Sequence, residues 1–137
     1  MPYRYQTRVR YGECDQQKIV FNPNYMIYMD DATEVWLTSS IPRGRYEDLG
    51  WDYMLVKTSI EWQGSARTGD LLDIDVGVMR YGSTSFDVGY VGTVDGQSIF
   101  TARAVCVSIQ RDSHEKYPTP DRIKEILGET VDWEVPS

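Results

Sequence analysis

The segment from Tyr11 to Tyr25 contains the residues whose types and spacing could do chemistry. It places the carboxylate of Asp15 seven residues before Asn22, and Asn22-Pro23 is a typical helix start. Free N–H groups and the positive end of the helix dipole can polarise a carbonyl, while a carboxylate can attack that carbonyl or deprotonate a water. The residues alone leave a second interpretation open, in which Asp15 only shapes a turn through its local backbone.

Other catalytic arrangements have little support in the sequence. The single histidine, His114, lies in a polar stretch typical of a loop. Ser-His-Asp and Cys-His machinery needs an imidazole base, and zinc sites use several His or Cys ligands. The cysteines Cys14 and Cys106 form neither a disulfide framework nor a C-x-x-C motif. We therefore expect no metal site, and chemistry carried by carboxylates, backbone N–H groups, hydroxyls or a cofactor.

Length and charge limit the class of protein. The 137 residues correspond to one domain, and their formal net charge is -7. This acidity argues against nucleic acid as a partner, because phosphate backbones are bound by clustered Lys and Arg. No apolar run is long enough for a membrane span, and the first ten residues lack the apolar core of a signal peptide. We expect a cytoplasmic protein.

The hydropathy pattern predicts the two elements that flank Asp15. Residues 3–11 alternate between apolar and polar, as in a half-buried strand. A helix is expected from Asn22-Pro23 to about residue 39, with one apolar face. Pro42 and the polar run 43–50 indicate a break with one short helical turn. The helical face consists of Tyr25, Met29, Ala32 and Trp36, with Met26, Thr33 and Leu37 beside them.

Four further strands follow this break. In the second strand, one face is expected to consist of Met54, Val56, Thr58, Ile60 and Trp62. The third and fourth have apolar faces over 72–78 and 86–90, while the last, about 98–110, is apolar on both sides like a central strand. Asp95-Gly96 is a strong hairpin signal.

The chain is expected to form one domain over residues 1–137. A short helix at about 119–128 has Pro at its start and Gly at its end, and 129–137 is expected to be a loose tail. A long helix with five antiparallel strands is an α+β fold. Such a sheet leaves edges and one face to be covered, so we expect a homodimer or homotetramer.

Two stretches of the Asp15 segment resemble a known family. Tyr11-Gly-Glu-Cys-Asp15 and Ile19-Val-Phe-Asn-Pro-Asn-Tyr25 are similar to the 4-hydroxybenzoyl-CoA thioesterase family of hotdog-fold acyl-CoA thioesterases. Weaker similarity at 60–76 and 81–86 extends the resemblance to about residues 5–111. It implies a hotdog fold, in which a five-stranded antiparallel sheet wraps around one long central helix. It also implies hydrolysis of a small acyl-CoA, with aroyl-CoA among the options.

The resemblance assigns roles to individual residues. It makes Asp15 the nucleophile or general base and the backbone N–H of Asn22 the donor that binds the thioester oxygen. Coenzyme A is then part of the substrate, and no cofactor is expected. Asp30 matches an acid of the hydroxybenzoyl enzyme and could accept a hydrogen bond from a hydroxylated acyl group, although a solvated Asp30 is the alternative. Tyr25 is a candidate acyl contact, with a core position as its alternative.

The phosphates of coenzyme A call for cations near strand ends. The resemblance implies that coenzyme A lies across a dimer interface and that the turn Arg80 to Ser85 touches its nucleotide. Arg80, Ser83, Ser85 and Arg111 are therefore candidate binding residues, with Arg103 and Lys116 as further cations.

Departures from the family pattern keep other functions open. Lys18 stands where the family commonly has Gly, and Asn22 stands where relatives often have His or Tyr. Glu13 could couple to the titration of Asp15 or be solvated. The alternatives are a non-catalytic acyl-thioester binding module and a thioesterase acting on an acyl carrier protein. A hotdog dehydratase or hydratase would need a His/Asp pair, for which His114 is the only histidine.

Overall fold

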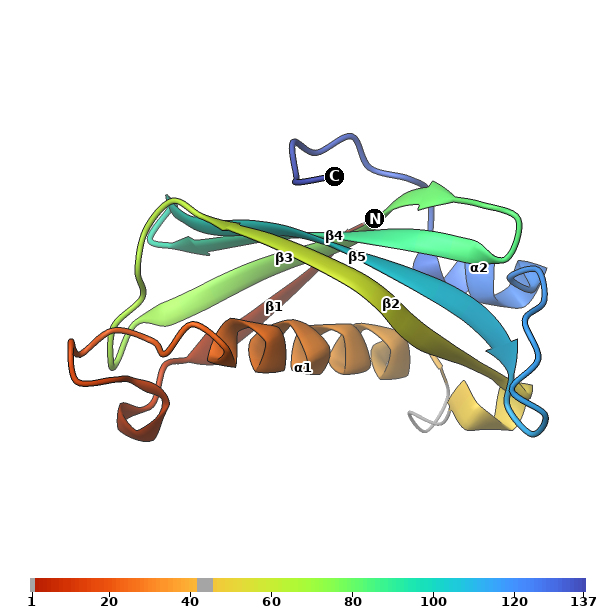
Figure 1. Cartoon of the computed structure of the whole chain (residues 1–137), viewed down its shortest axis with the longest axis horizontal. Helices are drawn as coiled ribbons and strands as arrows, with labels where there is room; N and C mark the ends of the chain where they lie inside the picture. The colour runs from red at the N-terminus through yellow and green to blue at the C-terminus, as the bar shows by residue number, and fades with distance from the viewer. Residues whose placement is uncertain (1, 42–45) are drawn as a thin grey trace.

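Five antiparallel strands form one sheet, and one long helix lies across its concave face (Figure 1). The computed structural model describes residues 2–41 and 46–137. The strand order is β1-β3-β4-β5-β2, so β1 and β2 are the edges of the sheet. This architecture confirms the α+β hotdog expectation. The elements are β1 (Tyr3–Arg8), η1 (Tyr11–Glu13), α1 (Asn24–Ser39), η3 (Tyr46–Leu49), β2 (Trp51–Trp62), β3 (Leu71–Tyr81), β4 (Ser85–Val94), β5 (Gln97–Gln110) and α2 (Asp121–Leu127).

The strands do not all pair in chain order. β3, β4 and β5 form two successive hairpins, whereas β2 crosses over to pair with β5, and β1 pairs with β3. Asp95 and Gly96 both have positive φ, 49° and 78°, as a type I′ turn requires, so the predicted hairpin is confirmed. The crossover was not visible in the sequence, because alternation reports the faces of a strand and not its neighbours.

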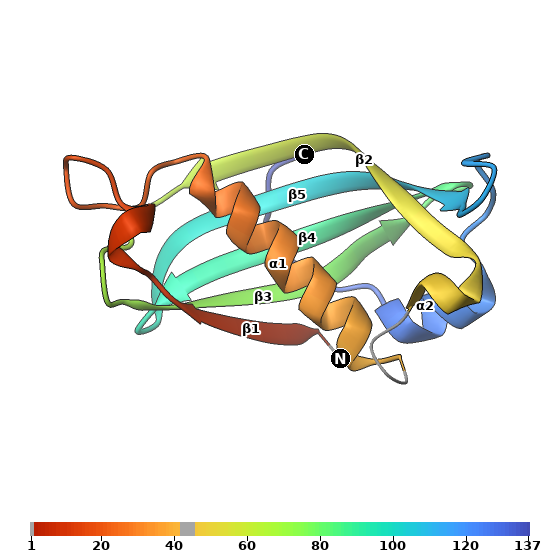
Figure 2. The same cartoon turned by 90° about the horizontal axis from the view of Figure 1, so that it is seen from below.

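Helix α1 crosses the sheet diagonally (Figure 2). It begins at Asn24 rather than at Asn22-Pro23, although Pro23 already has helical φ and ψ. Its first bonds run from residue i to i−3, beginning with Asn24 N–H to the Phe21 carbonyl. The predicted face is largely correct, except that Met26 is 38% exposed and Tyr28 is buried as well. The buried residues are Tyr25, Tyr28, Met29, Ala32, Thr33, Trp36 and Leu37.

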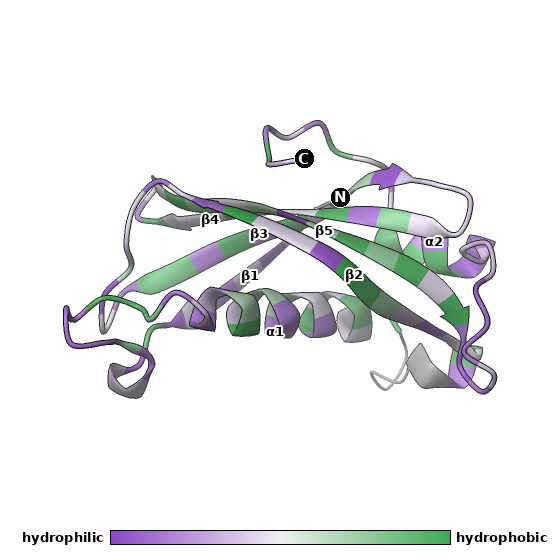
Figure 3. Cartoon of the chain, viewed as in Figure 1, coloured by the Kyte–Doolittle hydropathy of each residue, from purple (hydrophilic) through white to green (hydrophobic). Residues whose placement is uncertain are grey.

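A bulge in β2 reverses part of the predicted face. Leu55 pairs with Cys106 and Lys57 with Val105, which leaves Val56 as an extra residue. The side chains that share the helix-facing side are therefore Tyr53 and Leu55 before the bulge and residues 58, 60 and 62 after it. The prediction that Met54 and Val56 share a face with Trp62 is wrong, because a single inserted residue exchanges the two faces of a strand. Met54, Leu55 and Val56 are about half exposed, at 53%, 45% and 58%. They form the hydrophobic stretch visible on β2 in Figure 3.

Between α1 and the sheet lies a close aromatic contact. Phe100 on β5 occupies the space beside Gly92 on β4, where a Cβ would lie 2.2 Å from the ring. The Phe100 ring centroid is 5.3 Å from that of Tyr25 on α1. Gly92 therefore lets Phe100 reach the helix.

The C-terminal segment covers the other face of the sheet (Figure 1). Val131 N–H donates to the Val78 carbonyl at 2.8 Å, and the side chains of Val131 and Trp133 fill the space above Gly77 and Gly89. The expected loose tail at 129–137 is thus packed, because these two glycines leave a groove that apolar side chains can fill. The predicted break at Pro42 lies outside the described residues, and the short helical turn is η3.

Candidate active site

Asp15 lies at the start of a tight loop between η1 and α1. Asp15 N–H donates to the Ile19 carbonyl at 2.9 Å, and Lys18 N–H donates to the Asp15 carbonyl at 2.9 Å. Gln17 N–H donates to Asp15 Oδ1 at 2.8 Å. Lys18 has φ of 68°, the left-handed conformation that closes a three-residue hairpin loop. This geometry explains why glycine suits the position.

The Asp15 carboxylate is anchored through one oxygen only. Its Oδ1 accepts the bond from Gln17, which is the turn-forming interaction that the residues alone suggested. Its Oδ2 has no hydrogen-bond partner in the described part of the chain. A carboxylate held in this way keeps lone pairs available for attack or for proton transfer.

A cavity of about 740 Å³ opens beside Asp15. This volume lies within the usual range for a small-molecule site. Its charged residues are Asp15, Lys18 and Arg67. The complete lining is Tyr11, Gly12, Cys14, Asp15, Gln16, Lys18, Arg67 and Thr68.

Asn22 lies just before α1 and outside this lining. Its backbone N–H has no hydrogen-bond partner among residues 2–41 and 46–137, whereas its carbonyl accepts from Tyr25 N–H at 3.2 Å. Pro23 has no N–H to offer. A backbone donor without a partner among the described residues therefore lies at the positive end of the α1 dipole, where negative charge is favoured.

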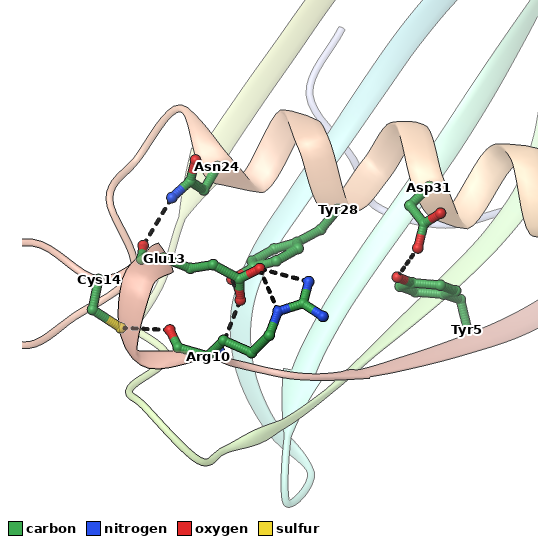
Figure 4. A network of polar contacts seen from close by, with 7 residues as sticks. All are labelled: Tyr5, Arg10, Glu13, Cys14, Asn24, Tyr28 and Asp31. Atoms are coloured by element: carbon green, nitrogen blue, oxygen red, sulfur yellow. Dashed lines mark hydrogen bonds and ion pairs between the residues drawn. The ribbon is translucent and has the colours of Figure 1, made fainter.

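Glu13 links the Asp15 loop to both neighbouring elements (Figure 4). Its backbone carbonyl accepts from Phe21 N–H at 3.0 Å and from the side-chain amide of Asn24 at 2.8 Å. Its carboxylate accepts from Tyr28 Oη at 2.9 Å and from the backbone and guanidinium of Arg10. We call Glu13, Asn24, Tyr28 and Arg10 the Glu13 brace. It fixes the loop that carries Asp15 against the first turns of α1.

The Glu13 brace keeps its carboxylate charged. Burial disfavours the charge, but hydrogen bonds from the Arg10 backbone, the Arg10 guanidinium and Tyr28 outweigh it, so the pKa of Glu13 is lowered. Glu13 is half-buried and paired rather than solvated, and its carboxylate accepts hydrogen bonds from Arg10 and Tyr28 and not from the Asp15 loop.

A second, smaller cavity lies between α1 and the sheet. Its volume is about 20 Å³, enough for one water, and Asp30 lines it together with Tyr90 and Thr58. Asp30 is exposed on one side, yet burial of its carboxyl raises its pKa. The Thr58 hydroxyl is buried without a hydrogen-bond partner among the described residues. The other lining residues are Met26, Met29, Thr33, Tyr53, Leu55, Ala104 and Cys106.

The predicted aromatic contacts differ in their exposure. Tyr25 is 1% exposed, and its hydroxyl accepts from Ala66 N–H at 3.2 Å, so it packs in the core of this chain. Phe21 and Trp62 are 53% and 44% exposed. Both flank the start of α1 at the Asp15 end of the molecule.

The predicted phosphate-binding residues lie at the opposite end of the sheet (Figures 1 and 2). β3 runs for 11 residues from the Asp15 end to Tyr81, which separates Arg80, Ser83 and Ser85 from Asp15 by about 30 Å. Arg80 lies 3.7 Å from Asp87, which also pairs with Arg103 at 2.7 Å. Arg111 pairs with Asp52 at 3.1 Å. One copy of the chain therefore does not bring these residues to Asp15.

Sequence reasoning missed several residues of the site. Arg67 and Thr68 line the Asp15 cavity because Arg67 forms a backbone bridge with Ile19. The Asn24 side chain was not identified from the sequence as a contact of the Asp15 loop, although Asn24 directly follows Pro23. The similarity at 66–70 was a signal for this segment, but it gave no indication that the segment faces the Asp15 loop.

Comparison with known proteins shows the family of this chain. A family model described as the thioesterase-like superfamily matches residues 9–127. The chain belongs to this superfamily. The resemblance seen in the Tyr11 to Tyr25 segment is thereby confirmed, and the thioesterase-like model covers α1, β2 to β5 and α2 but begins after β1.

Individual relatives are distant but match almost the full chain. A 1,4-dihydroxy-2-naphthoyl-CoA hydrolase from Synechococcus elongatus is 24% identical over 133 residues, which are 95% of this chain and 98% of the relative. A 1,4-dihydroxy-2-naphthoyl-CoA thioesterase from Synechocystis has a TM-score of 0.79 at 20% identity, covering 93% of this chain and 96% of that one. A mutant 4-hydroxybenzoyl-CoA thioesterase complexed with 4-hydroxybenzoyl-CoA has a TM-score of 0.82 at 20% identity, covering 93% and 99%. These structures share the fold of this thioesterase-like chain.

No helix among the described residues is long and apolar enough to cross a membrane. No group of three or more His, Cys, Asp or Glu among them could hold a metal ion.

Proposed function

We propose that this protein is a thioesterase that hydrolyses a small acyl-CoA, with Asp15 as its catalytic carboxylate. The observation that carries the proposal is the carboxylate itself, which is anchored through Oδ1, has no partner at Oδ2 among the described residues and lines a ligand-sized cavity. Membership of the thioesterase-like superfamily supports the reaction class.

The reaction needs one water and no bound cofactor. Either Asp15 attacks the thioester carbon and forms an acyl anhydride that water then hydrolyses, or it takes a proton from the water that attacks. In both routes negative charge develops on the carbonyl oxygen, and we assign the Asn22 N–H as its donor. The carbon–sulfur bond breaks, the thiolate takes up a proton, and the products are a carboxylic acid and free coenzyme A.

The second cavity suggests the nature of the acyl group. Asp30, Thr58 and Tyr90 offer polar atoms within an otherwise apolar lining. The unpartnered Thr58 hydroxyl and the raised pKa of Asp30 favour a hydrogen-bonding group there. Because the cavity has room for one water only, that group would be the hydroxyl at the tip of an aroyl ring rather than the whole ring. We assign Asp30 as the acceptor for such a hydroxyl.

The coenzyme A site would then combine two copies of the chain. β2 is an edge strand that runs from Trp51, next to Arg111, to Trp62 near the Asp15 end. Antiparallel pairing of β2 with its copy would place the Arg111 end of the second copy beside the Asp15 end of the first. We propose that Arg111 and the turn Arg80 to Ser85 of the second copy receive the phosphates. A homodimer is the smallest assembly that completes this site.

A free-thiol assay over a panel of acyl-CoA and acyl carrier thioesters tests the proposal. Asp15→Asn should reduce kcat by at least about 10²-fold on the best substrate, comparable to the loss of an oxyanion donor. Unchanged secondary structure by circular dichroism would show that the variant folds. Turnover by Asp15→Asn at the rate of the parent would refute the catalytic role.

A non-catalytic acyl-thioester binding module is the second candidate. The bond from Gln17 N–H to Asp15 Oδ1 favours it, because that bond also suits an aspartate with a purely structural role. Tight binding of acyl-CoA without thiol release across the whole panel would support this alternative, and turnover would remove it.

A further inference from the structure

Cations without an ion-pair partner gather at the Asp15 end of the molecule. Lys18 and Arg67 line the Asp15 cavity, and neither forms an ion pair within residues 2–41 and 46–137. The Arg8 guanidinium lies 3.9 Å from the position of a Cβ on Gly69, two residues from Arg67. In contrast, Arg10 at this end pairs with Glu13. Five more arginines of the described residues pair with carboxylates elsewhere, namely Arg4, Arg80, Arg103, Arg111 and Arg122.

The backbone holds Lys18 and Arg67 close to each other. Ile19 forms an antiparallel bridge with Arg67, and Val20 N–H donates to the Ala66 carbonyl at 2.9 Å. The backbone of Lys18 is in the left-handed conformation, which costs about 1 kcal/mol or more for a residue other than glycine. Strain of this kind often marks a functional position.

We propose that Lys18 and Arg67 bind an anionic oxygen group, carboxylate or phosphate, carried by the thioester substrate. The inference rests on the proposed function, because it places that group in the same cavity as the reacting carbonyl. The cations and Asp15 line one cavity, so the anion lies close to the thioester carbon. The phosphates of coenzyme A are separated from the sulfur by the long pantetheine arm. This geometry favours an acyl group that carries its own carboxylate.

Binding to the Asp15→Asn protein tests this inference without relying on turnover. Calorimetry would compare glutaryl-CoA with pentanoyl-CoA, which differ by the terminal carboxylate, and both with their pantetheine thioesters, which lack the nucleotide phosphates. The added substitutions are Lys18→Asn, which tolerates the left-handed backbone, Lys18→Arg, which keeps the charge, and Arg67→Gln. Arg122→Gln on α2 is the matched control, since it removes one exposed arginine charge far from the cavity.

We expect glutaryl-CoA to bind about tenfold tighter than pentanoyl-CoA, because one charge-assisted hydrogen bond contributes about that much affinity. Lys18→Asn with Arg67→Gln should abolish this preference, Lys18→Arg should retain it, and Arg122→Gln should leave it unchanged. If the double variant instead weakens both CoA thioesters and neither pantetheine thioester, the anion is a coenzyme A phosphate.

The inference is overturned if the double variant binds all four thioesters as tightly as its Asp15→Asn parent, or if Arg122→Gln has the same effect. A failure of the proposed function gives a different result. In that case the protein without any substitution releases no thiol from any substrate, while the binding preference and its loss in the double variant remain measurable.

Discussion

At the scale of the residue, Lys18 combines a strained backbone with an exposed charge. Its φ of 68° is one that glycine adopts without strain. Lys18→Gly should therefore raise the free energy of unfolding by about 0.5–1 kcal/mol, after allowance for the greater freedom of glycine in the unfolded chain. Urea unfolding would measure the change. Gln17→Gly is the control, because Gln17 has no positive φ and its replacement should destabilise the protein.

Glu13 makes a pH-dependent contribution to stability. Its pKa is lowered in the folded protein, so its contribution is present above the ordinary carboxyl pKa of about 4.3 and is lost as the pH falls through the folded value. Glu13→Gln replaces the ionisable carboxyl by a neutral amide. The parent should be more stable than Glu13→Gln at pH 7, and the difference should shrink as the pH falls below the ordinary carboxyl value of about 4.3. A difference that stays constant from pH 7 to pH 3 would contradict the charged role of Glu13.

At the scale of the element, the Asn24 amide joins helix α1 to the Asp15 loop. Asn24→Ala removes its bond to the Glu13 carbonyl and should cost about 1 kcal/mol of stability. If the Glu13 brace positions Asp15, kcat should fall several-fold with little change in KM. Steady-state kinetics would measure both. Thr38→Ala, at the other end of α1, removes a bond to the Glu34 carbonyl and should leave kcat unchanged.

The elements also show what the sequence could and could not predict. Helix α1, the Asp95-Gly96 hairpin and the position of Asp15 before a helix follow from local signals, because capping, periodicity and turn residues act over a few positions. The bulge at Val56 and the Ile19–Arg67 bridge do not, since each depends on a partner far away in the chain. The packed segment 129–137 escaped prediction for the same reason. Its groove is formed by glycines on β3 and β4.

At the scale of the whole molecule, the exposed edge of β2 leads to a prediction about assembly. If two copies pair through β2, light scattering should give twice the chain mass of 15.8 kDa. Met54→Lys with Val56→Lys should shift the protein to monomer and abolish turnover, because the phosphate-binding end of the second copy is then absent. Leu71→Lys is the control, since Leu71 is 50% exposed but lies away from β2. A monomeric parent with full activity would rule out a site shared between copies.

The contact between Gly92 and Phe100 connects the middle of the sheet to the site. Phe100 packs on Tyr25, the Tyr25 hydroxyl accepts from Ala66 N–H, and the Ala66 carbonyl accepts from Val20 N–H in the chain after the Asp15 loop. A methyl group at Gly92 would displace Phe100 and loosen this series of contacts without altering any reacting group. Gly92→Ala should therefore give a temperature-sensitive allele, whose protein is active in cells grown at low temperature and inactive in cells grown at higher temperature.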